Sequence, residues 1–146
     1  MPTRTARTAW NGSLETGEGQ VEMTSSGVGT YDVSFPKRAA DEANGSTSPE
    51  ELLAAAHSAC YAMQFSAVLG AAGGTVEALD VKADVTLGPD SAGGFRLTGI
   101  ALTVRGEVSG IDEAAFQAAA QDAKETCPVS KALTGVEITL DATFEG

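Results

Sequence analysis

The first 35 residues contain three short stretches in which apolar and polar side chains alternate, which is the period of a β-strand with one covered face. The pattern predicts strands near residues 4–10, 19–26 and 29–35, separated by turns that contain glycine. Because proline cannot donate to a strand ladder, Pro36 is expected to end the third strand. Residues 37–47 are predicted to form a polar loop.

A helix is predicted to begin at Ser48, which is a good N-cap. Pro49 suits the first helical position, and Glu51 completes a capping box. Residues 52–74 then carry no charged side chain, a length that meets the threshold for a transmembrane helix. Alanine dominates this run, polar residues interrupt it, and the flanking segments alternate like strands of a soluble sheet. We therefore expect no membrane span but a helix buried in a core or an interface, ended by the glycine pair at 73–74.

The second half of the chain shows two long strand patterns and another helix. Residues 79–87 alternate strictly, which predicts a strand with one solvated face. The next strand, through residues 95–104, changes the parity of its apolar positions at Gly99, as a β-bulge requires. Asp112 can cap a second helix, and a final strand is predicted over residues 136–145. The apolar stripe of that helix consists of Phe116, Ala119, Ala120, Ala123 and Cys127.

The predicted order is therefore β-β-β-α-β-β-α-β. It indicates an α+β fold with a mostly antiparallel sheet and two principal helices packed on it. With 146 residues, the chain is expected to form one domain spanning residues 1–146. Its content of 42% hydrophobic and 20% charged residues is typical of a folded soluble protein rather than a disordered one.

Charge and cysteine usage narrow the classes of partner. Nine Lys and Arg against 20 Asp and Glu give a formal charge of -11, which repels nucleic-acid backbones and anionic lipid surfaces. No nucleic-acid partner is expected. The first nine residues lead into no apolar signal region, so a cytoplasmic location is the expectation. In a reducing compartment, the two cysteines are expected to rest as thiols.

These two thiols are the strongest candidates for chemistry, because the chain has no phosphate-binding glycine loop, no Gly-x-Ser-x-Gly elbow and a single histidine. Cys60 lies inside the uncharged helix, where burial would raise the pKa of its thiol and leave it inert. Cys127 precedes Pro128 and can cap a new short helix, whose N–H groups together with Lys131 would favour a thiolate. Plain packing of either cysteine remains open on these grounds.

Two motifs resemble a known family. The first runs from Ser48-Pro-Glu-Glu-Leu to His57-x-x-Cys60, and the second, Thr126-Cys-Pro-Val-Ser130, places Cys127 67 residues after Cys60. Together they resemble the OsmC/Ohr family of hydroperoxide reductases, and the second motif is closer to the OsmC branch. The resemblance implies an intertwined homodimer and a thiol-dependent peroxidase that reduces organic hydroperoxides to alcohols without a metal or cofactor.

The resemblance also assigns roles. It implies that Cys60 is the peroxidatic cysteine, which becomes a sulfenic acid, and that Cys127 is the resolving cysteine, which forms a disulfide with it. An external dithiol, of which a lipoylated protein is one candidate, would then reduce this disulfide. Glu50 corresponds to the glutamate that orients an arginine, and Arg38 is the candidate arginine, with Lys37 as a weaker substitute because the loop is slightly longer than usual.

Helix geometry adds a constraint to this site. Ten residues separate Glu50 from Cys60, which is about 15 Å along an unbroken helix. Either the helix breaks between them, or Arg38 and Glu50 act on the cysteine of a partner chain; a homodimer is the expectation. Met63 and Phe65 are read either as an apolar substrate entrance or as plain core packing.

Other functions remain open on the residues alone. His57 is assigned a structural or supporting role, three residues before Cys60 on nearly the same helix face. One alternative is a zinc-binding protein in which His57, Cys60, Cys127 and a carboxylate hold the metal. The other is a noncatalytic dimeric binding module whose cysteines merely pack.

Overall fold

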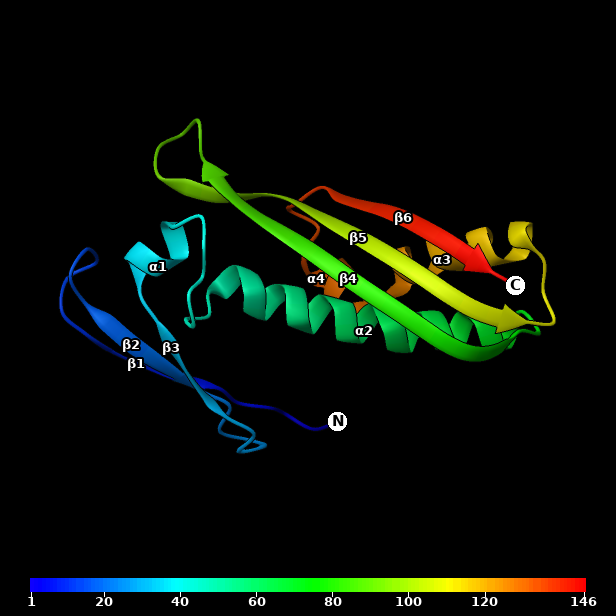
Figure 1. Ribbon diagram of the computed structural model, residues 1–146, viewed down its shortest axis with the longest axis horizontal. Helices are drawn as coiled ribbons and strands as arrows, with labels where there is room; N and C mark the ends of the chain where they lie inside the picture. Colours follow the sequence, from blue (N-terminus) through cyan, green and yellow to red (C-terminus); the bar gives the residue numbers. More distant parts are fainter. The chain divides into compact units, whose positions relative to one another are not determined.

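A computed structural model describes all 146 residues, in two units: Met1–Leu52 and Leu53–Gly146. The first unit holds an antiparallel sheet of three strands in the order β1 (Arg7–Asn11), β2 (Glu18–Glu22) and β3 (Thr30–Val33), as Figure 1 shows. The three predicted strands are therefore confirmed with shorter bounds.

The prediction of a polar loop from residue 37 is wrong at its start, because the chain forms a short helix there, α1 (Phe35–Ala39). The Ser34 side chain caps this helix by accepting a hydrogen bond from the Lys37 N–H. Pro36 lies in the first turn, where its missing N–H costs no intrahelical bond. The residue expected to end a strand thus starts a helix, and that helix carries Arg38.

Helix α2 (Pro49–Ala71) begins and ends where the sequence predicts. Ser48 Oγ accepts a hydrogen bond from the Glu51 N–H at 3.1 Å. The N-cap role of Ser48 is therefore confirmed. The predicted capping box is wrong, because the Glu51 carboxylate accepts a hydrogen bond from the Thr47 hydroxyl at 2.6 Å instead of one from the Ser48 N–H. At the other end Gly73 adopts a φ of 91°, a conformation that glycine reaches without a Cβ penalty. The helix is unbroken between these ends.

The expectation that this helix is buried in a core is confirmed on one face only, and its burial in an interface stays a prediction. Four side chains at a spacing of four residues are fully buried, and they form one stripe: His57, Tyr61, Phe65 and Leu69. Met63, between them in sequence, is 74% exposed. By length and composition alone, α2 could cross a membrane, a test that core helices of soluble proteins also pass. Two side chains of the buried stripe form hydrogen bonds with the neighbouring helices, as polar groups in a packed core do: Tyr61 with α3 and His57 with α4.

The second unit contains a sheet of three strands in the order β4 (Thr75–Pro89), β5 (Phe95–Ser109) and β6 (Ile138–Glu145). The pair β4 and β5 is antiparallel, whereas β5 and β6 run parallel because helices connect them. The predicted bulge is confirmed: Thr86 pairs with Gly99 and Leu87 with Leu97, which leaves Thr98 as the extra residue.

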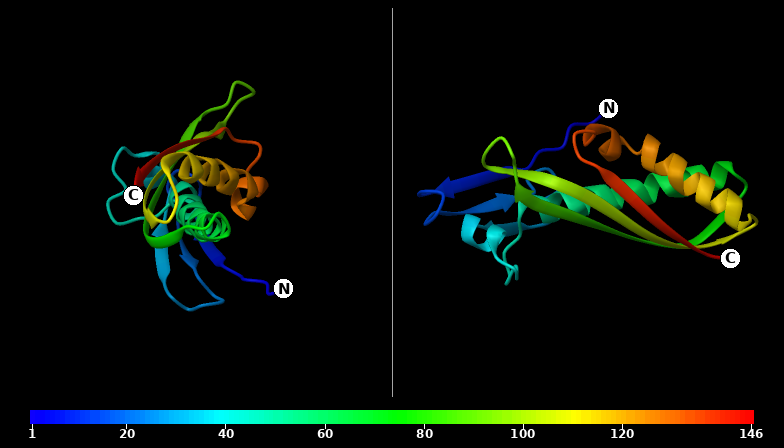
Figure 2. Two further views of the ribbon diagram at one scale, coloured as in Figure 1. Left: turned by 90° about the vertical axis from the view of Figure 1, so that its right-hand side faces the viewer. Right: turned by 90° about the horizontal axis from the view of Figure 1, so that it is seen from above.

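Two helices lie between β5 and β6 in the chain: α3 (Glu113–Thr126) and α4 (Pro128–Ala132). Asp112 caps α3 by accepting from the Ala115 N–H at 2.8 Å, as predicted. Figure 2 shows α2 and α3 on the same face of the sheet. The core between them includes a row of aromatic rings with centroids 4.9–5.5 Å apart: Tyr61, Phe65, Phe116 and Phe144. The α+β class is confirmed, with two short helices, α1 and α4, besides the two principal ones.

Candidate functional site

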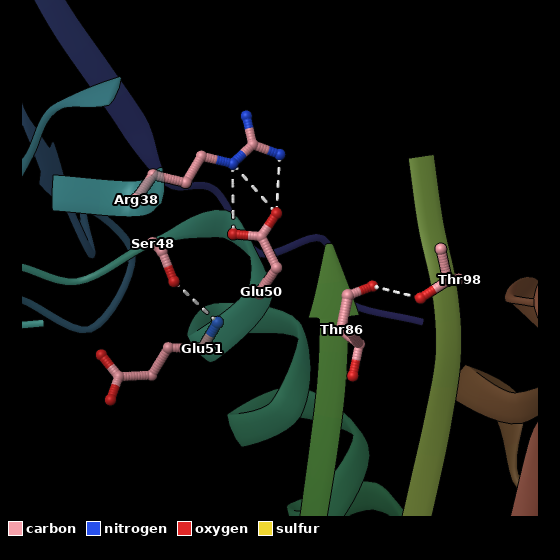
Figure 3. Close-up of polar contacts among 6 residues, drawn as sticks. All are labelled: Arg38, Ser48, Glu50, Glu51, Thr86 and Thr98. Carbon is pink, nitrogen blue, oxygen red and sulfur yellow. Dashed lines mark hydrogen bonds and ion pairs between the residues drawn. The ribbon is translucent and has the colours of Figure 1, made fainter. Parts of the chain in front are cut away.

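The first group of candidate residues is an ion pair in the Met1–Leu52 unit. Arg38, on α1, donates from Nε to Glu50 Oε1 at 2.9 Å and Oε2 at 3.1 Å, and from Nη2 to Oε1 at 2.7 Å (Figure 3). The side chains are 32% and 11% exposed, respectively. The partner of Glu50 is therefore Arg38 and not Lys37. Two nitrogens of one guanidinium bound to one carboxylate fix the plane of the cation.

The electrostatics of Glu50 follow from this pairing. Burial alone would raise the pKa of its carboxyl. Hydrogen bonds from Arg38, from its own backbone N–H and from Ser48, with the charge of Arg38, outweigh burial and hold the pKa below its ordinary value. Glu50 is therefore an anion at neutral pH. The outer edge of the guanidinium, Nη1, makes no bond to the carboxylate and remains able to face an anion.

A cavity of about 300 Å³ lies beside this pair, wholly within the first unit. Its lining is mostly apolar, from the sheet, α1 and the start of α2, with Arg38 among its few polar groups. Its side chains include Trp10, Leu14, Val21, Phe35 and Leu52. An apolar cavity with one cation is suited to a small organic molecule that carries a polar or anionic end.

The second group is the cysteine pair, in the Leu53–Gly146 unit. Cys60 lies on α2 and is partly exposed, whereas Cys127 lies between α3 and α4 and is fully buried. Both are free thiols, and a side-chain hydrogen bond joins them. Two residues 67 positions apart are thus within reach of one another, in the reduced state.

The surroundings of the two sulfurs differ. Burial acts to raise the pKa of Cys127, but the backbone N–H groups of Ser130 and Val129, the hydrogen bond from Cys60 and the Ser130 hydroxyl together lower it. Cys127 occupies the N-cap position of α4 as predicted, although without a strict side-chain cap hydrogen bond. Lys131 is exposed at the end of this helix.

Cys60 shows the opposite balance. Burial and the neighbouring Cys127 raise the pKa of its thiol, and only the Val129 N–H acts to lower it. The interaction between the two thiols raises the pKa of Cys60 and lowers that of Cys127. No cation of the second unit offsets this balance, so an activated Cys60 needs a positive charge from elsewhere.

Two further residues, His57 and Ser130, form a buried polar pair beside Cys127. His57 Nε2 and Ser130 Oγ are 2.7 Å apart, and both residues are buried. His57 was expected to be structural, and Ser130 was seen only as part of a motif. The one local signal for Ser130 was its position three residues after the N-cap Cys127, where a side chain can turn back toward the cap.

The remaining predicted residues fall outside the chemistry of the described site. Phe65 is fully buried and packs between the tilted rings of Tyr61 and Phe116, so its interpretation as part of a substrate entrance is wrong and core packing is confirmed. Met63 is exposed. No group of three or more His, Cys, Asp or Glu side chains is placed to hold a metal ion.

Comparisons with known proteins bear on this arrangement. Residues 41–141 match the model of the OsmC family, described as "OsmC-like protein". The chain is 42% identical over 132 residues to "Peroxiredoxin OsmC" of Escherichia coli (strain K12), covering 90% of each protein. Among solved structures it resembles the organic hydroperoxide resistance protein OhrB of Bacillus subtilis, with 28% identity, a TM-score of 0.74 and coverage of 95% of this chain and 98% of that one. An organic hydroperoxide resistance protein from Elizabethkingia anophelis gives 26% identity and a TM-score of 0.75 over 99% of both chains.

Proposed function

Because this chain belongs to the OsmC family, we propose that it is a cysteine-based peroxidase that reduces organic hydroperoxides to alcohols. The observation that carries the proposal is the pair of hydrogen-bonded free thiols, Cys60 partly exposed and Cys127 buried behind it. The names of its relatives, a peroxiredoxin and organic hydroperoxide resistance proteins, support this reaction and this substrate class. We infer that the whole chain works as one domain, in the cytoplasm.

The proposed cycle begins at the more accessible sulfur. The Cys60 thiolate attacks the peroxide oxygen distal to the organic group, the O–O bond breaks, and the alkoxide leaves and takes up a proton as the alcohol. Cys60 is thereby oxidised to a sulfenic acid. Cys127 then displaces the sulfenic hydroxyl as water and forms a disulfide. An external dithiol, a lipoylated protein being one candidate, reduces this disulfide to two thiols and is itself oxidised.

The first step requires a thiolate, and the second unit alone favours the protonated form of Cys60. A pKa lower by about three units corresponds to about 4 kcal/mol of extra stabilisation of the anion. A single charge at about 4 Å supplies about this amount at the effective dielectric constant typical of protein sites. One well-placed guanidinium therefore supplies a stabilisation of this order, which the charge of Glu50 partly offsets.

Arg38 is the proposed source of that charge. Glu50 fixes the plane of its guanidinium and leaves Nη1 free to face a thiolate or a peroxide oxygen. Since α2 is unbroken from Pro49 to Ala71, Glu50 and Cys60 are about 15 Å apart along one helix. We therefore assign the Arg38–Glu50 pair to the site of a second copy, in a homodimer. The apolar face of α2 that the single chain leaves exposed, with Met63, supports the same assembly.

Turnover of cysteine variants tests this function. With tert-butyl hydroperoxide and a dithiol, the wild-type protein should consume peroxide over many cycles, and more efficiently than it consumes hydrogen peroxide. Cys60→Ser should show no turnover. Cys127→Ser should perform a single reduction and then stall as the Cys60 sulfenic acid with any reductant that acts only on disulfides. Full turnover by Cys60→Ser would overturn the proposal.

A further inference from the structure

A buried polar pair behind the cysteines has no part in the proposed attack on peroxide. His57 is 0% exposed and Ser130 is 5% exposed, and their side chains meet at 2.7 Å between α2 and α4. Buried polar groups are expensive unless they are satisfied by hydrogen bonds. A pair of this kind next to two reactive thiols therefore calls for a role.

The direction of the hydrogen bond follows from what His57 leaves unpaired. Burial lowers the pKa of its imidazole, so the ring is neutral at pH 7, with one nitrogen as donor and the other as acceptor. Nδ1 is buried without a partner. An orphaned buried N–H is rarer than an orphaned acceptor, which places the proton on Nε2. Nε2–H then donates to Ser130 Oγ.

This direction determines where the Ser130 proton goes. A hydroxyl has a single proton, and with His57 as its donor the Ser130 oxygen keeps that proton for another acceptor. The neighbouring acceptor is the sulfur of Cys127, the N-cap residue three positions before Ser130, and the Ser130 hydroxyl acts to lower the pKa of this thiol. The result is a chain of hydrogen bonds that runs from His57 to Ser130 and ends on the Cys127 thiolate. Each bond in such a chain polarises and strengthens the next.

We infer that His57 is a positioning residue that acts through Ser130 to stabilise Cys127 as the thiolate that attacks the oxidised Cys60. Its consequence for turnover rests on the proposed function. As a thiolate, Cys127 attacks the Cys60 sulfenic acid, the S–S bond forms, and hydroxide leaves and takes up a proton as water. When the disulfide is reduced, the thiolate of the dithiol attacks the more exposed Cys60 sulfur, and Cys127 leaves with the electron pair of the broken bond. The second thiol of the reductant then attacks the mixed disulfide at the reductant's own sulfur, and Cys60 leaves as a thiolate.

The first test needs no variant of the pair. The chain contains one histidine, so nitrogen NMR of the imidazole reports on His57 alone. We expect the Nε2-protonated tautomer in the reduced wild-type protein at pH 7. The Nδ1-protonated tautomer would reverse the hydrogen bond and overturn the inference.

The second test measures the Cys127 thiol directly. In a Cys60→Ser background, Cys127 is the one remaining cysteine, and its ultraviolet thiolate absorbance is followed against pH. Ser130→Ala should raise the apparent pKa by about one unit, a tenfold loss of thiolate, whereas Ser130→Thr, which keeps the hydroxyl, should raise it less. His57→Leu should raise it as well, and His57→Gln, whose amide N–H can donate, should restore part of the shift.

Ser58→Ala is the matched control. This serine also lies on α2, but its exposed hydroxyl donates to the Ala55 carbonyl and should leave the pKa of Cys127 unchanged. Circular dichroism and urea unfolding verify that each variant folds. An unshifted pKa in folded Ser130→Ala or His57→Leu would overturn the inference. Neither measurement involves turnover, so a protein with the expected tautomer and pKa shifts but no peroxidase activity would refute the proposed function alone.

Discussion

The Arg38–Glu50 pair provides the most quantitative prediction. Glu50→Gln keeps the size of the side chain and removes its charge. The new amide can accept from Arg38 through one oxygen, but its NH₂ group faces an N–H of the guanidinium where the second carboxylate oxygen stood. The variant therefore loses the charge and one of the three hydrogen bonds of the pair.

The expected size follows from the exposure of the two side chains. Exposed ion pairs contribute about 0–1 kcal/mol, and breaking a fully buried pair costs about 3–5 kcal/mol. Glu50 is 11% exposed and Arg38 is 32% exposed, so the pair falls between these limits and solvent screens part of it. We expect Glu50→Gln to lower the free energy of unfolding by about 1–2 kcal/mol at pH 7.

The pH dependence has a definite sign. Because the folded protein holds the pKa of Glu50 below its ordinary value of 4.5, the pair contributes fully above that value. The contribution is lost as the pH falls through the folded pKa. The difference in unfolding free energy between wild type and Glu50→Gln should therefore shrink in acid.

Urea unfolding followed by circular dichroism, at neutral pH and in acid, measures both effects. Glu51→Gln is the matched control, since the adjacent carboxylate contacts only the Thr47 hydroxyl and should cost less. Equal losses for both variants, or a loss for Glu50→Gln that does not change with pH, would refute the reasoning.

Three further predictions concern the second unit. Gly106→Ala should lower the free energy of unfolding by about 1–3 kcal/mol, because its Cβ would lie 2.7 Å from the Phe116 ring; Gly135→Ala, which meets nothing within 4 Å, should change it little in the same urea series. Asp112→Ala should cost about 1 kcal/mol through loss of the α3 cap, seen as a lower urea midpoint with an unchanged slope. Burial lowers the pKa of His57, so at a pH below its ordinary value of 6.5 the unfolded state binds a proton that the folded state does not. The free energy of unfolding should therefore decrease as the pH falls below 6.5. A difference in unfolding free energy between wild type and His57→Gln that does not change with pH would contradict this.

The features that the sequence predicted correctly are those with local signals. The cap at Ser48, the cap at Asp112 and the bulge beside Gly99 are each set by a few neighbouring residues. The α1 helix was missed although its signal is also local, because Pro36 was read as the end of a strand rather than as the first turn of a helix capped by Ser34.

Long-range features were less accessible. The burial of α2 depends on which elements cover it, and a uniformly apolar helix does not say which face the chain covers and which it leaves exposed. The parallel pairing of β6 depends on the path of α3 and α4. His57 and Ser130 are 73 residues apart, and no local pattern indicates that they meet.

In the candidate site, too, the sequence and the three-dimensional packing provide different information. The residues of both pairs were identified through a family resemblance and not through spacing. The structure brings Arg38 to Glu50 and Cys60 to Cys127, each within its own unit. The opposite pKa shifts of the two thiols arise from burial and from N–H groups at the start of α4, which only three-dimensional packing defines.

The central claim is that a guanidinium keeps Cys60 anionic, and the pH dependence of its oxidation tests this most directly. In Cys127→Ser protein, the rate at which tert-butyl hydroperoxide converts Cys60 to a sulfenic acid is followed by chemical trapping and mass spectrometry. We predict an apparent pKa below that of a free cysteine, and a marked rise when Arg38→Ala is added. An apparent pKa at or above that of a free cysteine, unchanged by Arg38→Ala, would contradict the account.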